Sequence, residues 1–78
     1  MAEEKERKAI LEIAPSTKRE LIYKVVVKQK LKSFHVPLNP SAQGNRWYIK
    51  LEGEVSKIKA IANELDNYGV LMKQPTWM

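Results

Sequence analysis

The chain has 78 residues, of which 44% are hydrophobic and 29% are charged, and it contains no cysteine. This length allows one small domain with a single core, and the composition is typical of a globular chain rather than a disordered one. The absence of cysteine excludes disulfides and thiolate metal sites, so burial of apolar side chains must stabilise the fold.

The net charge of +5, from fourteen Lys and Arg against nine Asp and Glu, favours an anionic partner. Many small domains carry the same excess of positive charge for solubility alone, so the positions of the charges must show whether an anionic partner binds. No apolar run approaches the roughly 20 residues of a membrane span, and the start, MAEEKERKAI, lacks the apolar stretch of a secretory signal. We therefore expect a cytoplasmic protein with no membrane partner.

Residues 1–7 are almost all polar and predict a disordered N-terminal tail, followed by a single α+β domain at residues 8–78. In KAILEIAP, residues 8–15, apolar residues alternate between two faces, with Ala9, Leu11 and Ile13 on one and Ile10 on the other. This alternation predicts the first strand.

Residues 17–34 allow two interpretations. Thr17 and Glu20 match the capping-box pattern at the start of a helix. On a helix, however, the apolar residues of 21–34 spread around the whole cylinder. With a period of two, odd positions are mainly apolar, and three consecutive valines favour a strand; the even positions carry Lys24, Lys28, Lys30 and Lys32. A strand is the preferred interpretation and a helix the alternative.

Two prolines and a glycine make residues 35–45, HVPLNPSAQGN, a predicted loop. The next segment, RWYIKLEGE at residues 46–54, alternates again and predicts a third strand, which Gly53 ends. In this strand Trp47, Ile49 and Leu51 share one face.

A helix is predicted next, with Ser56 as its cap and Gly69 as the left-handed residue after its end. Its apolar residues recur at three- and four-residue spacing and are Val55, Ile58, Ile61, Ala62, Leu65 and Tyr68. Residues 70–73 predict a short last strand that stops near Pro75, with Trp77 either packed on the domain or free.

These elements predict an α+β fold, a small mainly antiparallel sheet in the order β-β-β-α-β with one helix packed on one face. A ferredoxin-like βαββαβ fold is the alternative. The predicted core under the helix consists of Leu11, Ile13, Tyr23, Val25, Val27, Trp47, Ile49 and Leu51. The other face would be uncovered and basic, with an apolar centre of Ile10, Ile22 and Val26.

A basic sheet face around a tyrosine is typical of surfaces that bind single-stranded nucleic acid, DNA or RNA, because lysines neutralise phosphates and an aromatic ring stacks on a base. The predicted binding residues are Lys24, Lys28, Lys30, Lys32, Arg46, Tyr48 and Lys50. The same pattern also fits a solvated strand whose lysines protect the sheet from aggregation.

The apolar centre of that face supports a second hypothesis. Two copies of the chain, or an acidic protein, would cover Ile10, Ile22 and Val26 and leave the lysines as a polar rim. The protein would then be an interaction or homodimerisation adaptor.

Residues 49–73, IKLEGEVSKIKAIANELDNYGVLMK, resemble the closing strand, helix and strand of ACT-like and NIL regulatory domains, through Gly53, Gly69 and the apolar spacing between them. Those families have ferredoxin-like folds and often bind amino acids at dimer interfaces. The resemblance therefore implies a small-ligand regulatory domain, and it implies a helix within residues 16–34, where the alternation favours a strand.

Catalytic and metal-binding patterns are missing from the sequence. His35 is the only histidine, and it lies between Phe34 and Val36, which is typical of a packed or surface residue. No serine belongs to a recognisable histidine-acid set, and neither GxSxG nor GxGxxG nor a phosphate-loop motif occurs. We expect a binding module that is not an enzyme and has no cofactor or metal.

Overall fold

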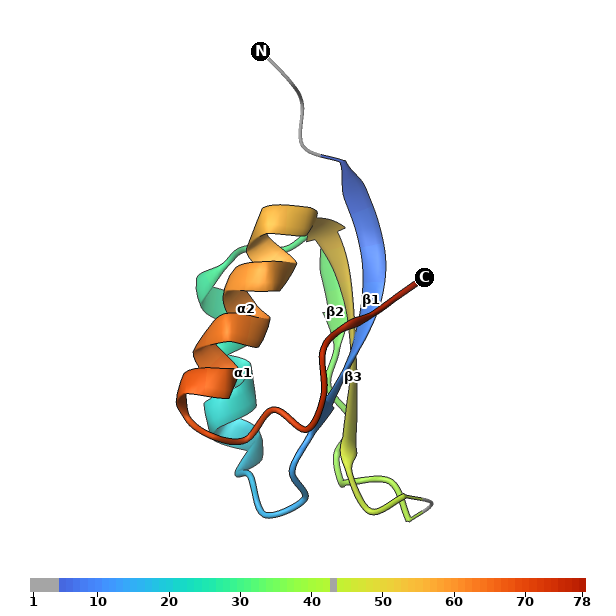
Figure 1. Ribbon diagram of the computed structural model, residues 1–78, viewed down its shortest axis with the longest axis vertical. Coiled ribbons are helices and arrows are strands. Elements are labelled where there is room, and N and C mark those ends of the chain that lie inside the picture. Colours follow the sequence, from blue (N-terminus) through green and yellow to red (C-terminus); the bar gives the residue numbers. More distant parts are fainter. Residues whose placement is uncertain (1–4, 43) are drawn as a thin grey trace.

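The computed structural model describes residues 5–42 and 44–78. In this part of the chain the elements are β1 (Glu6–Ile13), α1 (Arg19–Lys28), β2 (Ser33–His35), β3 (Trp47–Glu54), α2 (Val55–Asn67) and β4 (Thr76–Trp77). The strands form one antiparallel sheet in the order β2-β3-β1-β4, and both helices lie on the same side of it (Figure 1). The predicted α+β fold with a mainly antiparallel sheet is confirmed, and the element order is that of the ferredoxin-like alternative.

Residues 19–28 form helix α1, so the preferred strand at 21–34 is wrong and the order β-β-β-α-β becomes βαββαβ. Ile22, Val25 and Val26, spaced three and four residues apart, are fully buried and make up the apolar stripe of the helix. The strand interpretation placed Val27 in the core and Ile22 and Val26 on the uncovered face, whereas Val27 is 52% exposed. The strand preference of valine is weak, and packing of the stripe against the core overrides it.

The capping-box pattern marks the start of α1 without forming the expected cap. Lys18 is the N-cap residue and makes no side-chain hydrogen bond to the first turn. Thr17 is instead buried, and its Oγ1 has no hydrogen-bond partner within the described residues. Its carbonyl oxygen accepts a 3.0 Å hydrogen bond from Trp47 Nε1. This bond ties the β1–α1 connection to the start of β3.

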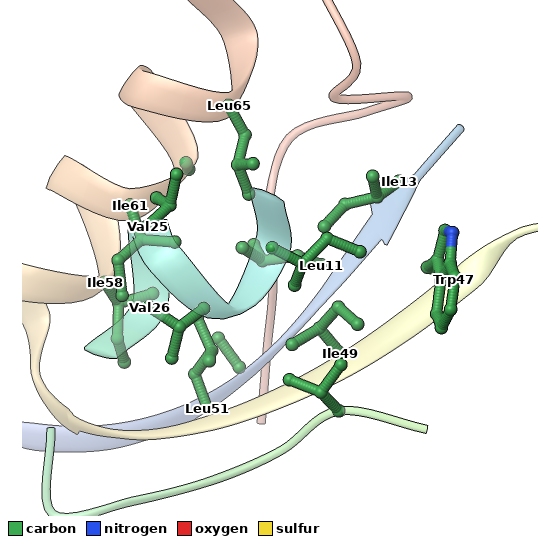
Figure 2. Close-up of a cluster of buried hydrophobic side chains, with 14 residues drawn as sticks. Leu11, Ile13, Val25, Val26, Trp47, Ile49, Leu51, Ile58, Ile61 and Leu65 are labelled. Carbon is green, nitrogen blue, oxygen red and sulfur yellow. The ribbon is translucent and has the colours of Figure 1, made fainter. Parts of the chain in front are cut away.

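One core lies between the helices and the sheet. Helix α2 lies over β1 and β3, and α1 packs beside α2. Figure 2 shows side chains from both helices and from the two central strands pointing into the same space. The buried residues are Ala9, Leu11, Ile13, Ile22, Val25, Val26, Val36, Trp47, Ile49, Leu51, Ile58, Ile61, Ala62 and Leu65. Tyr23 and Val27, predicted in the core, are exposed, and Ile22 and Val26, predicted on the uncovered face, are buried.

The predicted strand at residues 46–54 and the predicted helix that follows it are confirmed, with small changes at their ends. Strand β3 runs through Gly53 to Glu54, and Glu54 rather than Ser56 is the N-cap residue of α2. Gly69 has a φ of +77°, as expected for a left-handed residue after a helix. Tyr68 is the C-cap residue and is half-exposed.

The two ends of the domain differ from the prediction. The expected strand at 70–73 is reduced to a single bridge between Leu71 and Ile13, and β4 lies beyond Pro75. There Trp77 is opposite Ala9, and its side chain packs against the core. Of the predicted tail at residues 1–7, residues 1–4 lie outside the described residues, whereas residues 6 and 7 belong to β1. Neither helix in the described ranges has the length and apolarity needed to span a membrane.

Two neighbouring valines of α1 provide a direct test of its conformation. Val26→Asp places a carboxylate in the core and should lower the free energy of unfolding by roughly 3 kcal/mol or more. Val27→Asp, at a half-exposed position, should change it by less than about 1 kcal/mol. Urea unfolding followed by tryptophan fluorescence measures both. If Val27→Asp were the more damaging change, residues 21–32 would be extended and not helical.

Candidate functional site

The side of the sheet that faces away from the helices is not covered by any described element, and we call it the open face. Along each strand, side chains alternate between the core and this face. Residues directly opposite each other in antiparallel strands point to the same side. The open face therefore carries Glu6, Lys8, Ile10 and Glu12 of β1, Tyr48, Lys50, Glu52 and Glu54 of β3, Ser33 and His35 of β2, and Thr76 of β4.

Lys50 lies at the centre of this face. It is opposite Ile10 on β1 and opposite His35 on β2, so an aliphatic side chain and a histidine flank it across the sheet. Lys8 is the diagonal neighbour of Lys50, one pair further along the β1–β3 ladder. Such diagonal neighbours lie roughly 7–8 Å apart, which long side chains easily bridge. Two lysines and a histidine are thus gathered on three adjacent strands.

These three residues line a depression of about 310 Å³ on the open face. Its lining includes Lys8, Ser33, His35, Lys50, Glu52 and Met78. Within residues 5–42 and 44–78, neither Lys8 nor Lys50 forms an ion pair. Both lysines are exposed, and both are therefore available to an anion from solvent.

The carboxylates of the open face are held by other cations. Glu52 accepts a 3.1 Å hydrogen bond from Ser33 Oγ, and Lys32 Nζ lies 3.9 Å from its second oxygen. Lys32 also lies 3.7 Å from Glu6. Lys32 is thus shared between two carboxylates, and Glu52 also lies opposite Lys8 in the ladder. Lys8 and Lys50 form no ion pair among the described residues, and three lysines against Glu6 and Glu52 leave one positive charge in excess around the depression.

Glu12 is held by two cations at the other end of the face. Its Oε1 accepts a 2.8 Å hydrogen bond from Arg46 Nη1, and Lys73 Nζ lies 3.3 Å from Oε2. The hydrogen bond from Arg46 lowers the pKa of Glu12 below its ordinary value of 4.5, and Lys73 adds to this effect, while partial burial opposes it. Arg46 is therefore engaged in an ion pair rather than available to a phosphate.

Tyr48 is opposite Glu12 and is half-buried on the open face. The loop between β2 and β3 passes its hydroxyl end, because a Cβ added to Gly44 would lie 2.6 Å from Tyr48 Oη. Gly44 has a φ of +87°, a conformation that glycine adopts without strain. The missing side chain at Gly44 thus leaves room for the phenol group.

The structure does not assemble the predicted set of binding residues on one surface. Tyr48 and Lys50 lie on the open face, and Arg46 and Lys32 reach it only through their ion pairs with Glu12 and Glu52. Lys24 and Lys28 lie on α1, where Lys28 forms a 2.9 Å ion pair with Glu64, and Lys30 and Lys32 lie in the connection from α1 to β2. The cause is the helical period of residues 19–28, which places lysines four apart on one side of α1 and not on the sheet. The predicted apolar centre is also lost, because Ile22 and Val26 are buried.

Sequence reasoning missed Lys8 and His35 as members of the site. Lys8 is two residues before Ile10 on β1, so it points to the same face. Because Ile10 was assigned to the uncovered face, the β1 pattern could have assigned Lys8 to that face too. His35 was expected to be a packed or surface histidine, and it is exposed at the end of β2. Its position beside Lys50 depends on the register of β2 with β3, which sequence alone does not reveal. Among the residues that the structure describes, no cluster of His, Asp or Glu could hold a metal ion.

Comparisons of the chain with protein-family models, with curated proteins and with solved structures find no match in any of the three. The likeness of residues 49–73 to ACT-like and NIL domains stays a resemblance. The helix that it implied within residues 16–34 is present as α1. The small-ligand regulatory role that it implied stays a prediction.

The ion pairs of Glu12 predict a pH-dependent contribution to stability. Because folding lowers the pKa of Glu12, its contribution is present above pH 4.5 and is lost as the pH falls through the lower folded value. Glu12→Gln should therefore be less stable than the wild type at neutral pH, and the difference should shrink in acid. Urea unfolding of the wild type and of Glu12→Gln, at neutral pH and in acid, measures this difference in the free energy of unfolding. Asp66→Asn, on the exposed side of α2, is the control. An equal deficit of Glu12→Gln at both pH values would contradict the assignment.

Proposed function

We propose that the chain is a small non-enzymatic module that binds single-stranded nucleic acid on the open face of its sheet. The observation that carries the proposal is the unpaired couple Lys8 and Lys50, with His35 beside them, around a depression next to Ile10 and Tyr48. Positive charge for phosphates thus lies next to flat and apolar surface for bases. A partner of this kind is consistent with the expected cytoplasmic location.

The charge balance of the face supports binding of a polyanion. Each carboxylate near its centre already has a cation: Glu52 has Lys32, and Glu12 has Arg46 and Lys73. A phosphate that approaches Lys8 and Lys50 therefore displaces no internal ion pair. Ionic contacts of this type release counterions from the nucleic acid, so the affinity must fall as salt rises.

The shape of the face favours a single strand. A sheet surface lets splayed bases lie against exposed side chains, whereas base edges in a duplex are turned inward. Tyr48 offers an aromatic ring, and Ile10 offers an aliphatic surface one pair along the ladder. Stacking of a base on an aromatic side chain contributes about 1–3 kcal/mol and depends little on the base. The expected binding is therefore modest in strength and tolerant of sequence.

The two lysines can be tested by charge reversal. For single strands the slope of log affinity against log salt concentration is about −0.7 per neutralised phosphate. Two phosphate contacts therefore predict a slope of about −1.4, and Lys50→Glu should bring that slope to about −0.7. Lys8→Glu should act in the same way. Fluorescence anisotropy with a labelled single-stranded oligonucleotide, titrated at several salt concentrations, measures both the affinity and the slope.

Lys59→Glu is the matched control, because it makes the same charge change on the exposed surface of α2. It should alter binding only slightly. The proposed function fails if no oligonucleotide binds even at low salt. The proposed location fails if Lys50→Glu and Lys59→Glu weaken binding equally, since net charge alone would then control the affinity.

The stacking role of Tyr48 has its own test. Tyr48→Leu keeps an apolar side chain but removes the ring, and should weaken oligonucleotide binding by about 1–3 kcal/mol without changing the salt slope. Tyr68→Leu at the end of α2 removes another half-exposed ring away from the sheet and should leave the affinity unchanged. Titration of both variants by the same anisotropy measurement shows whether the Tyr48 ring contributes to binding. Equal affinity of Tyr48→Leu and the wild type would remove Tyr48 from the site.

A further inference from the structure

A second surface lies on α1 and the adjoining β2–β3 loop, apart from the open face. Three depressions meet there, and Tyr23 lines all of them. The first lies on α1 between Glu20, Lys24, Val27 and Lys28, and the second lies beside Arg19 and Glu20. The third extends past Arg19 to residues 34–39, of which Phe34 and His35 also line the open-face depression. We call this the Tyr23 surface. Two of its apolar residues are largely exposed to solvent: the exposed fraction is 52% for Val27 and 77% for Leu38.

The centre of the Tyr23 surface is held in place by contacts with the loop. The guanidinium of Arg19 lies 4.7 Å from the centre of the Tyr23 ring and donates hydrogen bonds to the carbonyl oxygens of Pro37, at 2.9 Å, and Val36, at 3.2 Å. The Tyr23 ring also meets Phe34 edge to face, with ring centres 5.7 Å apart. A partner would therefore meet a preformed surface, which reduces the entropy lost on binding.

Charge on the Tyr23 surface is mainly positive. The side chains that line it include Arg19, Lys24 and Lys28 against one carboxylate, Glu20. Lys28 is paired with Glu64 at 2.9 Å, whereas Lys24 has no ion pair within the described ranges. An apolar centre with a basic rim is complementary to an apolar side chain flanked by carboxylates.

Other occupants fit this surface less well. A second copy of the chain would bring the same excess of positive charge to the contact, and like charges oppose association. Nucleic acid would find cations, but the Tyr23 ring, on which a base could stack, already contacts Arg19 and Phe34, and the exposed groups of Val27 and Leu38 offer no second ring. An apolar side chain of a protein, in contrast, gains from burial against both.

We propose that the Tyr23 surface binds an acidic protein segment that inserts an apolar side chain beside Tyr23 and places a carboxylate next to Lys24. The binding does not require Lys8 or Lys50, because neither lysine lines the Tyr23 surface. The two surfaces share only Phe34 and His35 of β2, which line the open-face depression as well. The chain would then hold an acidic protein independently of any nucleic acid.

The test is a selection from a phage-displayed library of random linear peptides against the full chain, with Val27→Asp as the counter-selection target. Val27 is exposed, so this variant should keep its fold, which amide NMR spectra verify. Selected peptides should be enriched in Asp and Glu around a leucine or an aromatic residue. Their affinity should fall about tenfold or more with Lys24→Glu, as for a central interface residue. Lys59→Glu, with the same charge change on α2, should leave it unchanged.

Chemical-shift changes on addition of a selected peptide should fall on the amides of α1 and of residues 34–39. The proposal is overturned if no selected peptide depends on Val27, if the selected peptides are not acidic, or if Lys24→Glu and Lys59→Glu act alike. It is also overturned if oligonucleotides shift the amides of Tyr23 and Val27, or if light scattering shows a dimer that Val27→Asp dissociates. Loss of oligonucleotide binding in Lys50→Glu leaves these outcomes unaffected, so the two proposals can fail separately.

Discussion

The ladder between β1 and β3 is the constraint on which the rest of the structure depends. These strands pair over eight residues each, from Glu6 opposite Glu54 to Ile13 opposite Trp47. The register places Leu11 and Ile49 under the helices, and by the same alternation it places Ile10 and Lys50 on the other side. A shift of one residue would turn the buried set to solvent, so burial of the core also fixes which charges share the open face.

Ion pairing then decides which of those charges remain available. Glu12 pairs with Arg46, which directly precedes β3, and with Lys73 from the segment after α2, and Glu52 pairs with Lys32 from the connection after α1. An argument from sequence treats all lysines and arginines as equivalent members of a basic face. In the folded chain, Arg46 and Lys32 pair with nearby carboxylates, and Lys8 and Lys50 are the open-face lysines without an ion pair in the described residues. Exposed ion pairs contribute little to stability individually, but they shape the electrostatic field of a surface strongly.

Local periodicity predicted most of the fold, and it failed where a segment had two competing periods. In β1 and β3 every second residue is apolar, and α2 repeats its apolar residues at helical spacing, so these elements were predicted correctly. In residues 21–28 the additional apolar residues Tyr23 and Val27 concealed the stripe of Ile22, Val25 and Val26. Only tertiary packing distinguishes these two sets, because α1 is buried along the side that meets α2 and the sheet. The error in this segment carried over to the predicted site. Lys50 and Tyr48 were assigned to a strand that is present, whereas Lys24 and Lys28 were assigned to a strand that is in fact helix α1.

The same change of period that removes Lys24 and Lys28 from the sheet gives them a different setting. On a strand, Tyr23 and Val27 would have faced the core with the lysines on the opposite side. On a helix, residues three and four apart are neighbours, so Tyr23, Lys24, Val27 and Lys28 form one patch on the outer side of α1. The connection from α1 to β2 packs closely on β3 at Gly53, where an added Cβ would lie 2.8 Å from Leu31 Cδ2 and 3.3 Å from the backbone nitrogen of Lys32. The basic charge of this chain is therefore divided between two surfaces of different character: a sheet face where cations flank a ring and a depression, and a helix face where cations flank aliphatic groups. The two surfaces meet at Phe34 and His35 of β2, but their cations lie on different elements and share no ion pair, so a change at Lys24 should leave Lys8 and Lys50 intact.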